Sequence, residues 1–346
     1  MDELTALVTD YVMRQGACAA GVATLETLVG GPPSADITYV LPEAKSAVSF
    51  AVPLEQEHIR PFLSKKDFQS HEQDNVLKNA LSSGIGLHLS DFLEQRGYPS
   101  VPLAANLRYR TDTPRGMRDL MPPISLRYLA VRSGVGFFGL SGNVLTKKEG
   151  AGIILGGVVT AAELTPTDPI AEEENYCDGC KLCMASCPSG LMDPEEKAEI
   201  TLGNRTFSYS RRKGYVRCEY VCGGFAGLHS SGKWSTWSPA RFPIPEKDED
   251  FREVFRPAAK AYWKRPEGGG GFYHPLMKTR IWQTCGNCQI VCHPDKEERK
   301  ARYELLTRSG VVVENPDGSR EAVSPEEAVA RIEAMAPDRR ALYEMP

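Results

Sequence analysis

The residues of this 346-residue chain whose type and spacing indicate chemistry are its cysteines. Nine of the ten lie between Cys177 and Cys292. The N-terminus has neither the charged nor the apolar region of a secretory leader, so we expect a reducing compartment. Cysteines of this density in such a compartment indicate metal ligation before disulfides.

Four of these cysteines form the run Cys177-Asp-Gly-Cys180-Lys-Leu-Cys183-Met-Ala-Ser-Cys187-Pro188. This is the C-x2-C-x2-C-x3-C-P pattern, in which three closely spaced thiolates hold one [4Fe-4S] cluster and the fourth reaches a second cluster. Zinc is the alternative, but it is typically held by two C-x2-C pairs around one ion. That arrangement leaves the third cysteine and the Cys-Pro step unexplained, so the spacing favours iron–sulfur.

A second run, Cys285-Gly-Asn-Cys288-Gln-Ile-Val-Cys292, is one cysteine short of the same pattern. Two clusters need eight thiolates and the runs supply seven, so the eighth comes from Cys218 or Cys222. The two-cluster pattern assigns one cluster to Cys177, Cys180, Cys183 and Cys292. It assigns the other to Cys187, Cys285, Cys288 and one of Cys218 and Cys222. Cys18 is left as a small buried apolar residue.

The elements that position these cysteines begin with an N-terminal domain. Apolar periodicity predicts helices over 4–15, 71–96 and 124–133, and continuous apolar runs predict buried strands over 46–52 and 153–160. Their alternation indicates an α/β or α+β domain over 1–165. A protein that only carries electrons needs no such domain, so we expect this part to receive them.

A proline-bearing segment, Thr165–Pro169, separates this domain from the cysteine-rich part. We expect a double-cluster domain over 170–295, with an aromatic- and glycine-rich insert at about 190–280 and a flexible tip at Gly268–Gly271. The remaining 296–346 should form a short appendage. It contains a hairpin over 311–318 and a helix that opens at Ser324, where Ser-Pro-Glu-Glu has the spacing of a capping box.

Charge and hydropathy exclude two broad classes of protein. Lys and Arg number 41 against 45 Asp and Glu, a formal net charge of −4, which removes a general electrostatic case for nucleic-acid binding. No run of about 18 apolar residues occurs, so we expect no membrane span.

Several motifs in order resemble a known family. The glycine-rich segment Leu129–Thr146 is followed by apolar Ile154–Thr160, by Asp168-Pro169 and by the first cysteine run. This order resembles the core of epoxyqueuosine reductases and reductive dehalogenases, which are cobalamin-dependent reductases with two [4Fe-4S] clusters. The resemblance covers roughly residues 105–190 and 280–294. It implies an α+β fold, with a nitroreductase-like α/β domain followed by a ferredoxin-like double-cluster module.

The resemblance also implies residues around a cobalamin. Those expected to approach the corrin are Gly134, Gly136, Gly139, Ser141 and Asn143, and Ser189 is expected near the edge of the macrocycle. For the glycines, ordinary tight-turn chemistry is the alternative. The context Cys218-Glu-Tyr resembles that of the family's cluster ligand, so Cys218 is favoured over Cys222.

Asp112 in Arg-Thr-Asp-Thr-Pro matches the aspartate that epoxyqueuosine reductases use as a proton donor, and Tyr109 lies beside it in sequence. Reductive cleavage of a C–O or C–halogen bond needs such an acid, and Asp112 serves if burial raises its pKa. The alternative is an Asx-type turn. The tyrosine and basic partner of the dehalogenases find no counterpart in the sequence.

Other features depart from the family. Cys292-His-Pro-Asp stands where Cys-Pro-Trp-Asn is usual, and about fifty residues follow where many epoxyqueuosine reductases add a basic tRNA-binding domain. No twin-Arg leader precedes the chain. The insert 222–237 is unusual and rich in aromatic residues. We expect its rings either to line a substrate channel or to pack the scaffold: Phe225, His229, Trp234 and Trp237. His274 and His293 are expected at the surface or in hydrogen bonds.

Together these features predict a cytoplasmic reductase that passes electrons through two [4Fe-4S] clusters to a cobalamin and cleaves a C–O or C–halogen bond. We expect a small-molecule or nucleoside-like substrate and a low-potential donor such as ferredoxin or flavodoxin. One alternative is an electron-transfer or activator protein. Another is epoxyqueuosine reductase proper, although tRNA is not favoured because Arg211–Arg217, the one concentrated basic patch, is more often a solvated loop.

Overall fold

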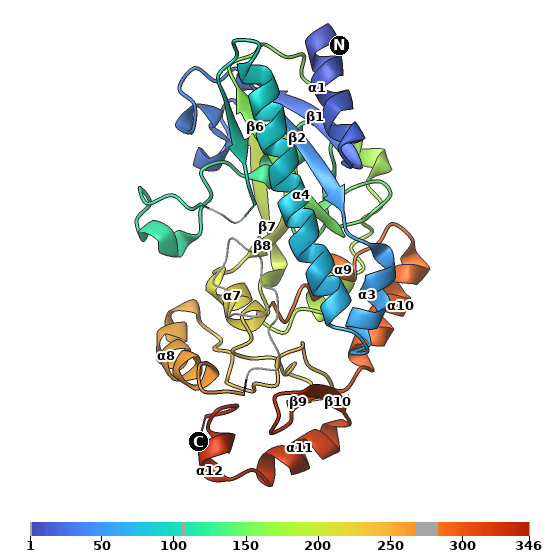
Figure 1. The fold of residues 1–346 in the computed structure, drawn as a ribbon, viewed down its shortest axis with the longest axis vertical. Helices are drawn as coiled ribbons and strands as arrows, with labels where there is room; N and C mark the ends of the chain where they lie inside the picture. The colour runs from blue at the N-terminus through green and yellow to red at the C-terminus, as the bar shows by residue number, and fades with distance from the viewer. Residues whose placement is uncertain (1, 106–107, 267–282, 346) are drawn as a thin grey trace. The chain divides into compact units, whose positions relative to one another are not determined.

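A computed structural model describes residues 2–105, 108–266 and 283–345 (Figure 1). The chain divides into two compact units, each described here by itself. Unit 1 comprises residues 1–54, 75–180 and 195–211, and unit 2 comprises 55–74, 181–194 and 212–346. The units therefore interleave along the sequence, unlike the consecutive domains expected from composition. The tip expected at Gly268–Gly271 lies outside the described residues.

Unit 1 is built on a four-stranded antiparallel sheet in the order β1-β2-β6-β3. The strands are β1 (Ala19–Thr24), β2 (Ser46–Pro53), β6 (Ile153–Thr160) and β3 (Ser100–Leu103). β2 is buried along nearly its whole length, because both faces of this central strand are covered. The two strands predicted from apolar runs, β2 and β6, are thereby confirmed.

Helices cover the two faces of this sheet (Figure 1). Side chains of β2 alternate between the faces: Val48, Phe50 and Val52 pack with α1 (Glu3–Arg14) and with the unit 1 part of α4 (Gln69–Glu94). Ala47 and Ala51 pack on the other side with α5 (Leu126–Arg132). Side-chain caps at Asp2 and Ser125 begin α1 and α5. All three predicted helices of this part are confirmed.

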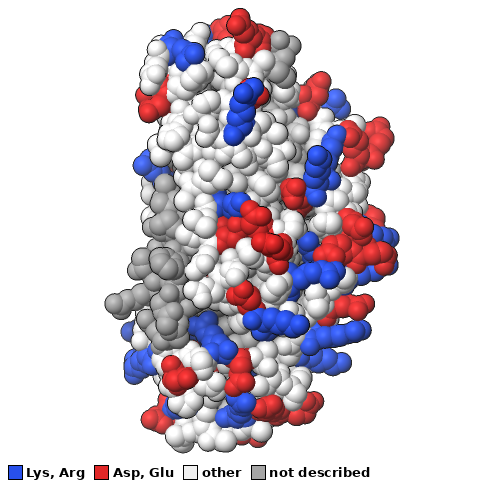
Figure 2. All heavy atoms as spheres, turned by 45° about the vertical axis from the view of Figure 1, so that its right-hand side comes forward, with Lys and Arg blue, Asp and Glu red and all other residues white. Residues whose placement is uncertain are grey.

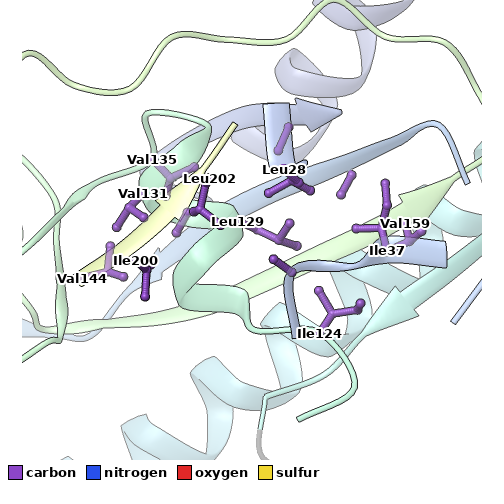
Figure 3. Close-up of a cluster of buried hydrophobic side chains, with 14 of the residues drawn as sticks. Leu28, Ile37, Ile124, Leu129, Val131, Val135, Val144, Val159, Ile200 and Leu202 are labelled. Carbon is purple, nitrogen blue, oxygen red and sulfur yellow. The ribbon is translucent and has the colours of Figure 1, made fainter. Parts of the chain in front are cut away.

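The hairpin of β7 (Met192–Leu202) and β8 (Arg205–Arg212) has no counterpart among the predicted elements. Its residues Ile200, Leu202 and Tyr209 complete the core beneath α5, as Figure 3 shows for the first two. This packing explains why residues 195–211 belong to unit 1. A second small hairpin, β4 (Phe137–Phe138) with β5 (Val144–Leu145), lies within the glycine-rich segment.

Unit 2 consists mainly of short helices. α3 (Gln56–Leu63) and α6 (Leu182–Ala185) pack against α10 (Lys296–Thr307), and α6 also packs against α9 (Asn287–Ile290). An aromatic core that contains Tyr220 and Phe251 joins α7 (Val216–Cys222) to α8 (Phe251–Tyr262).

The end of the chain confirms two further expectations. β9 (Val311–Glu314) pairs antiparallel with β10 (Arg320–Val323), and Ser324 caps α11 (Pro325–Glu333) by accepting a hydrogen bond from the Glu327 N–H at 3.1 Å. The remaining helices are α2 (Leu25–Leu28), α12 (Pro337–Arg340) and single 3-10 turns at Pro33–Ala35, Ile37–Tyr39, Gly116–Asp119, Glu172–Glu174 and Asp248–Asp250. Within the described ranges, no helix has the length and apolar character needed to cross a bilayer. The expectation of a mixed fold of helices and sheet is confirmed.

Gly156 of β6 generates a prediction about this fold. It lies opposite Phe50 of β2, and a Cβ at this position would approach the Phe50 ring to 2.4 Å and the Ser82 Oγ to 2.5 Å. Because Phe50 is fully buried, Gly156→Ala should lower the free energy of unfolding by about 1–3 kcal/mol, measured by urea denaturation.

The matched control is Gly84→Ala in α4, where a Cβ meets nothing within 4 Å. This change should raise the free energy of unfolding by up to about 1 kcal/mol, because alanine favours a helix over glycine. A Gly156→Ala protein as stable as the parent would show that the core accommodates the methyl group.

Candidate functional site

Five cysteines of unit 2 lie together, and we call them the five-cysteine group: Cys187, Cys218, Cys222, Cys285 and Cys288. α7 carries the second and third, Cys187 follows α6, Cys285 precedes α9 and Cys288 belongs to α9. The Cys218 and Cys222 sulfur atoms are 3.6 Å apart. Cys187 and Cys288 are close enough to Cys218 and Cys285 for their charges to interact. None of these cysteines forms a disulfide in the described chain.

Contacts within this group shift the pKa values of its thiols in opposite directions. Hydrogen-bonding contact with Cys218 and Cys285 raises the pKa of Cys222 well above its usual value. The same contact lowers the pKa of Cys218. It also lowers that of Cys285 to about 7, with help from the backbone N–H groups of Asn287 and Gly286. Ionisation is thereby easier at Cys218 and Cys285 than at Cys222.

Two cations lie beside the five-cysteine group. Arg212 interacts with the charges of Cys218 and Cys288, and its Nη1 donates to the Tyr215 hydroxyl at 3.2 Å. Lys65 interacts with Cys285. Burial lowers the pKa of Lys65 to about 7, and its Nζ finds no hydrogen-bond partner among the residues that the structure describes. No sequence pattern singled out Lys65, and Arg212 was noted only within the basic segment Arg211–Arg217, with no link to cysteines.

The donor set of this group fits an iron–sulfur cluster. Among the described residues, no three His, Cys, Asp or Glu side chains converge on the position of a single metal ion. A [4Fe-4S] cluster takes each thiolate at a different iron, so its ligands need not converge on one point. Sulfur atoms that lie close together outside any disulfide, with the Lys65 amine beside them, match that requirement.

The other predicted ligands have separate surroundings. Cys183 lies on α6, and Cys292 follows α9, against which α6 packs. Cys177 and Cys180 belong to unit 1, where the Leu140 N–H donates to the Cys177 Sγ at 3.2 Å. Cys18 is partly buried, and this burial raises its pKa to about 11.

Ser189 lies beside Cys187 in the structure. Its side chain is buried, and its Oγ is 3.3 Å from the Cys187 Sγ. Its carbonyl accepts a hydrogen bond from the Arg217 Nη1 at 3.3 Å. A position at the edge of a macrocycle remains a prediction from resemblance.

The glycines of the glycine-rich segment are required by the chain's own packing. Gly134 has φ 75°, and a Cβ there would lie 2.2 Å from the Asp168 carbonyl oxygen. At Gly136 a Cβ would lie 2.6 Å from the Leu145 carbonyl oxygen, and at Gly139 it would lie 2.7 Å from the Leu145 Cδ1. Tight packing and turn chemistry therefore account for these three residues without a ligand.

Ser141 and Asn143 lie in the turn between β4 and β5. Ser141 is buried, and its Oγ accepts a hydrogen bond from the Asn143 N–H at 3.2 Å. This bond holds the shape of the hairpin that presents the Leu140 N–H to Cys177. Contact of either residue with a corrin remains a prediction.

Asp112 does not meet the condition set for it, because it is half-exposed and ion-paired. Its two carboxylate oxygens accept from the Arg110 Nε at 2.9 Å and Nη2 at 2.8 Å. This pairing lowers the pKa of Asp112, so the condition that burial should raise this pKa is not met. Arg110 also stacks over the Tyr39 ring at 3.8 Å, and Tyr109 is partly buried. The proton-donor role of Asp112 remains a prediction.

The segment Arg211–Arg217 is neither a basic surface nor a solvated loop throughout. Arg217 is buried, and its Nε donates to Asp248 at 2.5 Å. Arg212 faces cysteines, and Arg211 pairs with Glu196 at 2.7 Å within unit 1. On the face shown in Figure 2, positive and negative side chains are intermixed.

The aromatic residues of the insert pack the scaffold. Trp234 and Trp237 are buried, and the Trp237 Nε1 donates to the Phe62 carbonyl at 3.0 Å. The His229 ring stacks on Trp234 with centroids 4.5 Å apart. Phe225 is buried in the core between α7 and α8. The His293 ring accepts a hydrogen bond from the Asp295 N–H, as expected. His274 lies outside the described residues.

The curated proteins whose sequences resemble this chain share one name, epoxyqueuosine reductase. No family model matches the chain. An epoxyqueuosine reductase of Atelocyanobacterium thalassa is 42% identical over 67 residues, which are 19% of this chain and 21% of that protein. The epoxyqueuosine reductase of Vibrio cholerae serotype O1 is 26% identical over 229 residues, 62% of this chain and 54% of that protein. The chain spans about half the length of the curated relatives that it matches at length.

Solved structures overlap the chain more loosely. An epoxyqueuosine reductase with a tRNA-Tyr epoxyqueuosine-modified stem loop has a TM-score of 0.42 and 18% identity, over 96% of this chain and 73% of that one. A catabolic reductive dehalogenase in complex with 3-bromo-4-hydroxybenzoic acid has a TM-score of 0.48 and 12% identity, over 97% of this chain and 37% of that one. The curated relatives named epoxyqueuosine reductase confirm the resemblance that the motifs of this chain indicate.

Proposed function

We propose that the chain is an iron–sulfur reductase that resembles epoxyqueuosine reductases and reductively cleaves a C–O bond. The observation that carries this proposal is the five-cysteine group. It unites Cys187 of the first run with Cys285 and Cys288 of the second, which is the crossing that a two-cluster ferredoxin pattern requires. The curated relatives, all named for the reduction of an epoxide-bearing compound, support the reaction class.

In this proposal Cys187, Cys218, Cys285 and Cys288 hold one [4Fe-4S] cluster, which supplies one-electron transfer. Cys218 is taken as the fourth ligand because of its Cys218-Glu-Tyr context, and Cys222 is then the spare thiol. The second cluster, with Cys177, Cys180, Cys183 and Cys292, rests on the sequence spacing. An external low-potential donor such as ferredoxin or flavodoxin, in the cytoplasm, fits a chain of this kind.

The substrate class follows from the relatives. A C–O bond in a small-molecule or nucleoside-like substrate is favoured over a C–halogen bond, because the curated relatives carry the name of an epoxide reductase. A substrate carried on tRNA is the alternative form of the same reaction. Binding to tRNA that weakens steeply with salt would favour that form.

A cobalamin is implied by the resemblance. The glycines proposed to approach it are used in packing against Asp168 and Leu145, so these residues do not fit a role as a cradle for the corrin. No step of the reaction is therefore assigned to residues of this segment.

Asp112 is proposed to supply the proton that follows the electrons. While Arg110 holds both carboxylate oxygens, the ionised form is favoured and Asp112 has no proton to donate. Asp112 must therefore leave Arg110 and take up a proton before it acts as an acid. Tyr109 is its proposed neighbour in that role.

The assignment of the eighth ligand predicts different iron contents for two variants. Cys218→Ser should lose about half of the cluster iron, because it removes a ligand, whereas Cys222→Ser should keep it. Iron and sulfide analysis after anaerobic purification makes the comparison. The reverse result would make Cys222 the ligand.

The acid role predicts that Asp112→Asn slows turnover of a C–O substrate by about a hundredfold or more, measured in single-turnover assays with reduced protein. Asp119→Asn is the matched control, because Asp119 is likewise paired with an arginine, Arg115, at 2.6 Å. Equal rates for the Asp112 variant and the parent would exclude the role.

The proposed function predicts about eight irons per chain when the protein is produced anaerobically, and the resemblance predicts in addition that it takes up cobalt when cobalamin is supplied. Absorbance and cobalt analysis detect the corrinoid, and reduction of an epoxide-bearing nucleoside tests the reaction. Eight irons without cobalt or turnover would instead favour the electron-transfer alternative.

A further inference from the structure

One buried cation of unit 2 has no assigned task. The Lys65 side chain is 8% exposed, and its Nζ lacks a hydrogen-bond partner within the described residues. The Nζ lies 5.7 Å from the centroid of the Trp237 ring, and its charge interacts with Cys285. An ammonium group in such a place is costly unless a negative group compensates for it.

The backbone at Lys65 is also unusual. α3 ends in a Schellman motif, in which the Lys65 N–H donates to the Phe62 carbonyl at 3.2 Å and the Lys66 N–H to the Pro61 carbonyl at 2.9 Å. Lys65 occupies the left-handed position of this motif with φ 59°. Glycine adopts that conformation without strain, whereas a lysine does so at a cost. The position thus carries an unfavourable residue whose amine is buried.

Trp237 connects this helix end to the cysteine site. Its indole Nε1 donates to the Phe62 carbonyl at 3.0 Å, and its backbone N–H donates to the Thr284 carbonyl at 2.9 Å. Thr284 directly precedes Cys285. The end of α3 and the start of the second cysteine run are therefore held by the same tryptophan, which fixes the place of the Lys65 amine.

We propose that Lys65 is the buried counter-ion of the cluster held by Cys285 and that it raises the reduction potential of this cluster. The inference rests on the proposed function, since it requires that cluster. Reduction adds one negative charge, and a cation in a low-dielectric interior stabilises the more negative state. The sulfide and thiolate sulfur atoms of the cluster would accept hydrogen bonds from the Lys65 Nζ, for which the described residues provide no acceptor. Lys65 acts as a positioning residue for charge and makes no contact with substrate.

The test compares the midpoint potentials of variants in the complete protein, purified anaerobically with both clusters and titrated under electron paramagnetic resonance. Lys65→Met should lower the ratio of reduced to oxidised cluster at least about tenfold at a fixed potential, which is about 59 mV for one electron. Only one of the two cluster transitions should move. Lys65→Gly should shift it in the same direction, although glycine suits the backbone position.

Two controls separate charge from packing. Lys65→Arg keeps the charge and should hold the midpoint close to that of the parent, and Lys66→Met removes the adjacent exposed lysine and should leave it unchanged. Loss of about four irons in the Met and Gly variants, but not in the Arg variant, would likewise support the counter-ion role.

Other outcomes overturn the inference. If Lys65→Met and Lys65→Gly keep their iron and no midpoint moves, Lys65 is not the counter-ion, while the proposed function stands. If Lys65→Arg shifts the midpoint or loses iron as much as Lys65→Met, packing is responsible instead. A parent protein that binds no clusters under these conditions would refute the proposed function as well.

Discussion

Charge compensation around buried sulfur is the constraint on which the arrangement of unit 2 depends. Thiolates withdrawn from water are unfavourable unless donors or cations meet them. The structure provides the Cys222 thiol, backbone N–H groups at the start of α9, Arg212 near Cys218 and Cys288, and Lys65 near Cys285. These groups come from segments far apart in sequence. Residues 55–74 belong with the C-terminal unit because α3 packs against α10, and this packing brings Lys65 into unit 2.

The features that could be predicted are those encoded locally. Cysteine spacing indicated the ligand runs, and continuous apolar segments gave β2 and β6 the correct bounds to within one residue. The hairpin of β7 and β8 escaped prediction because most of β7 is polar, as in Asp193-Pro-Glu-Glu-Lys197, and only its end enters a core. Lys65 carries no local signal, since its role depends on Trp237 and Cys285, which lie more than 170 residues away. The resemblance singled out Asp112 as an acid but not its pairing with Arg110, two residues earlier, which depends on how the two side chains meet at the surface.

A glycine that matches a family pattern can be needed for one of two physical reasons, close approach of a cofactor or close packing of the chain. In unit 1 the structure distinguishes between them. A glycine beside a cofactor leaves its Cβ position open to the ligand, whereas Gly134, Gly136 and Gly139 have theirs closed by Asp168 and Leu145. What the segment contributes is shape: the β4–β5 hairpin is compact enough to bring a peptide group to Cys177. The same pattern thus reflects how the hairpin folds and does not by itself locate a corrin.

The backbone of Leu140 links that hairpin to two partners, because its N–H donates to the Cys177 Sγ and its carbonyl accepts from the Ser210 N–H. At position 140 both groups belong to the main chain, so nineteen of the twenty amino acids supply them and proline alone removes the donor. A substitution of Leu140 by any residue except proline therefore leaves the N–H donor to Cys177 in place. The glycines on either side of it, at 139 and 142, tolerate far less change, since one is closely packed and the other has φ 72°. Divergent relatives can therefore retain this sulfur contact at a position where their side chains no longer agree.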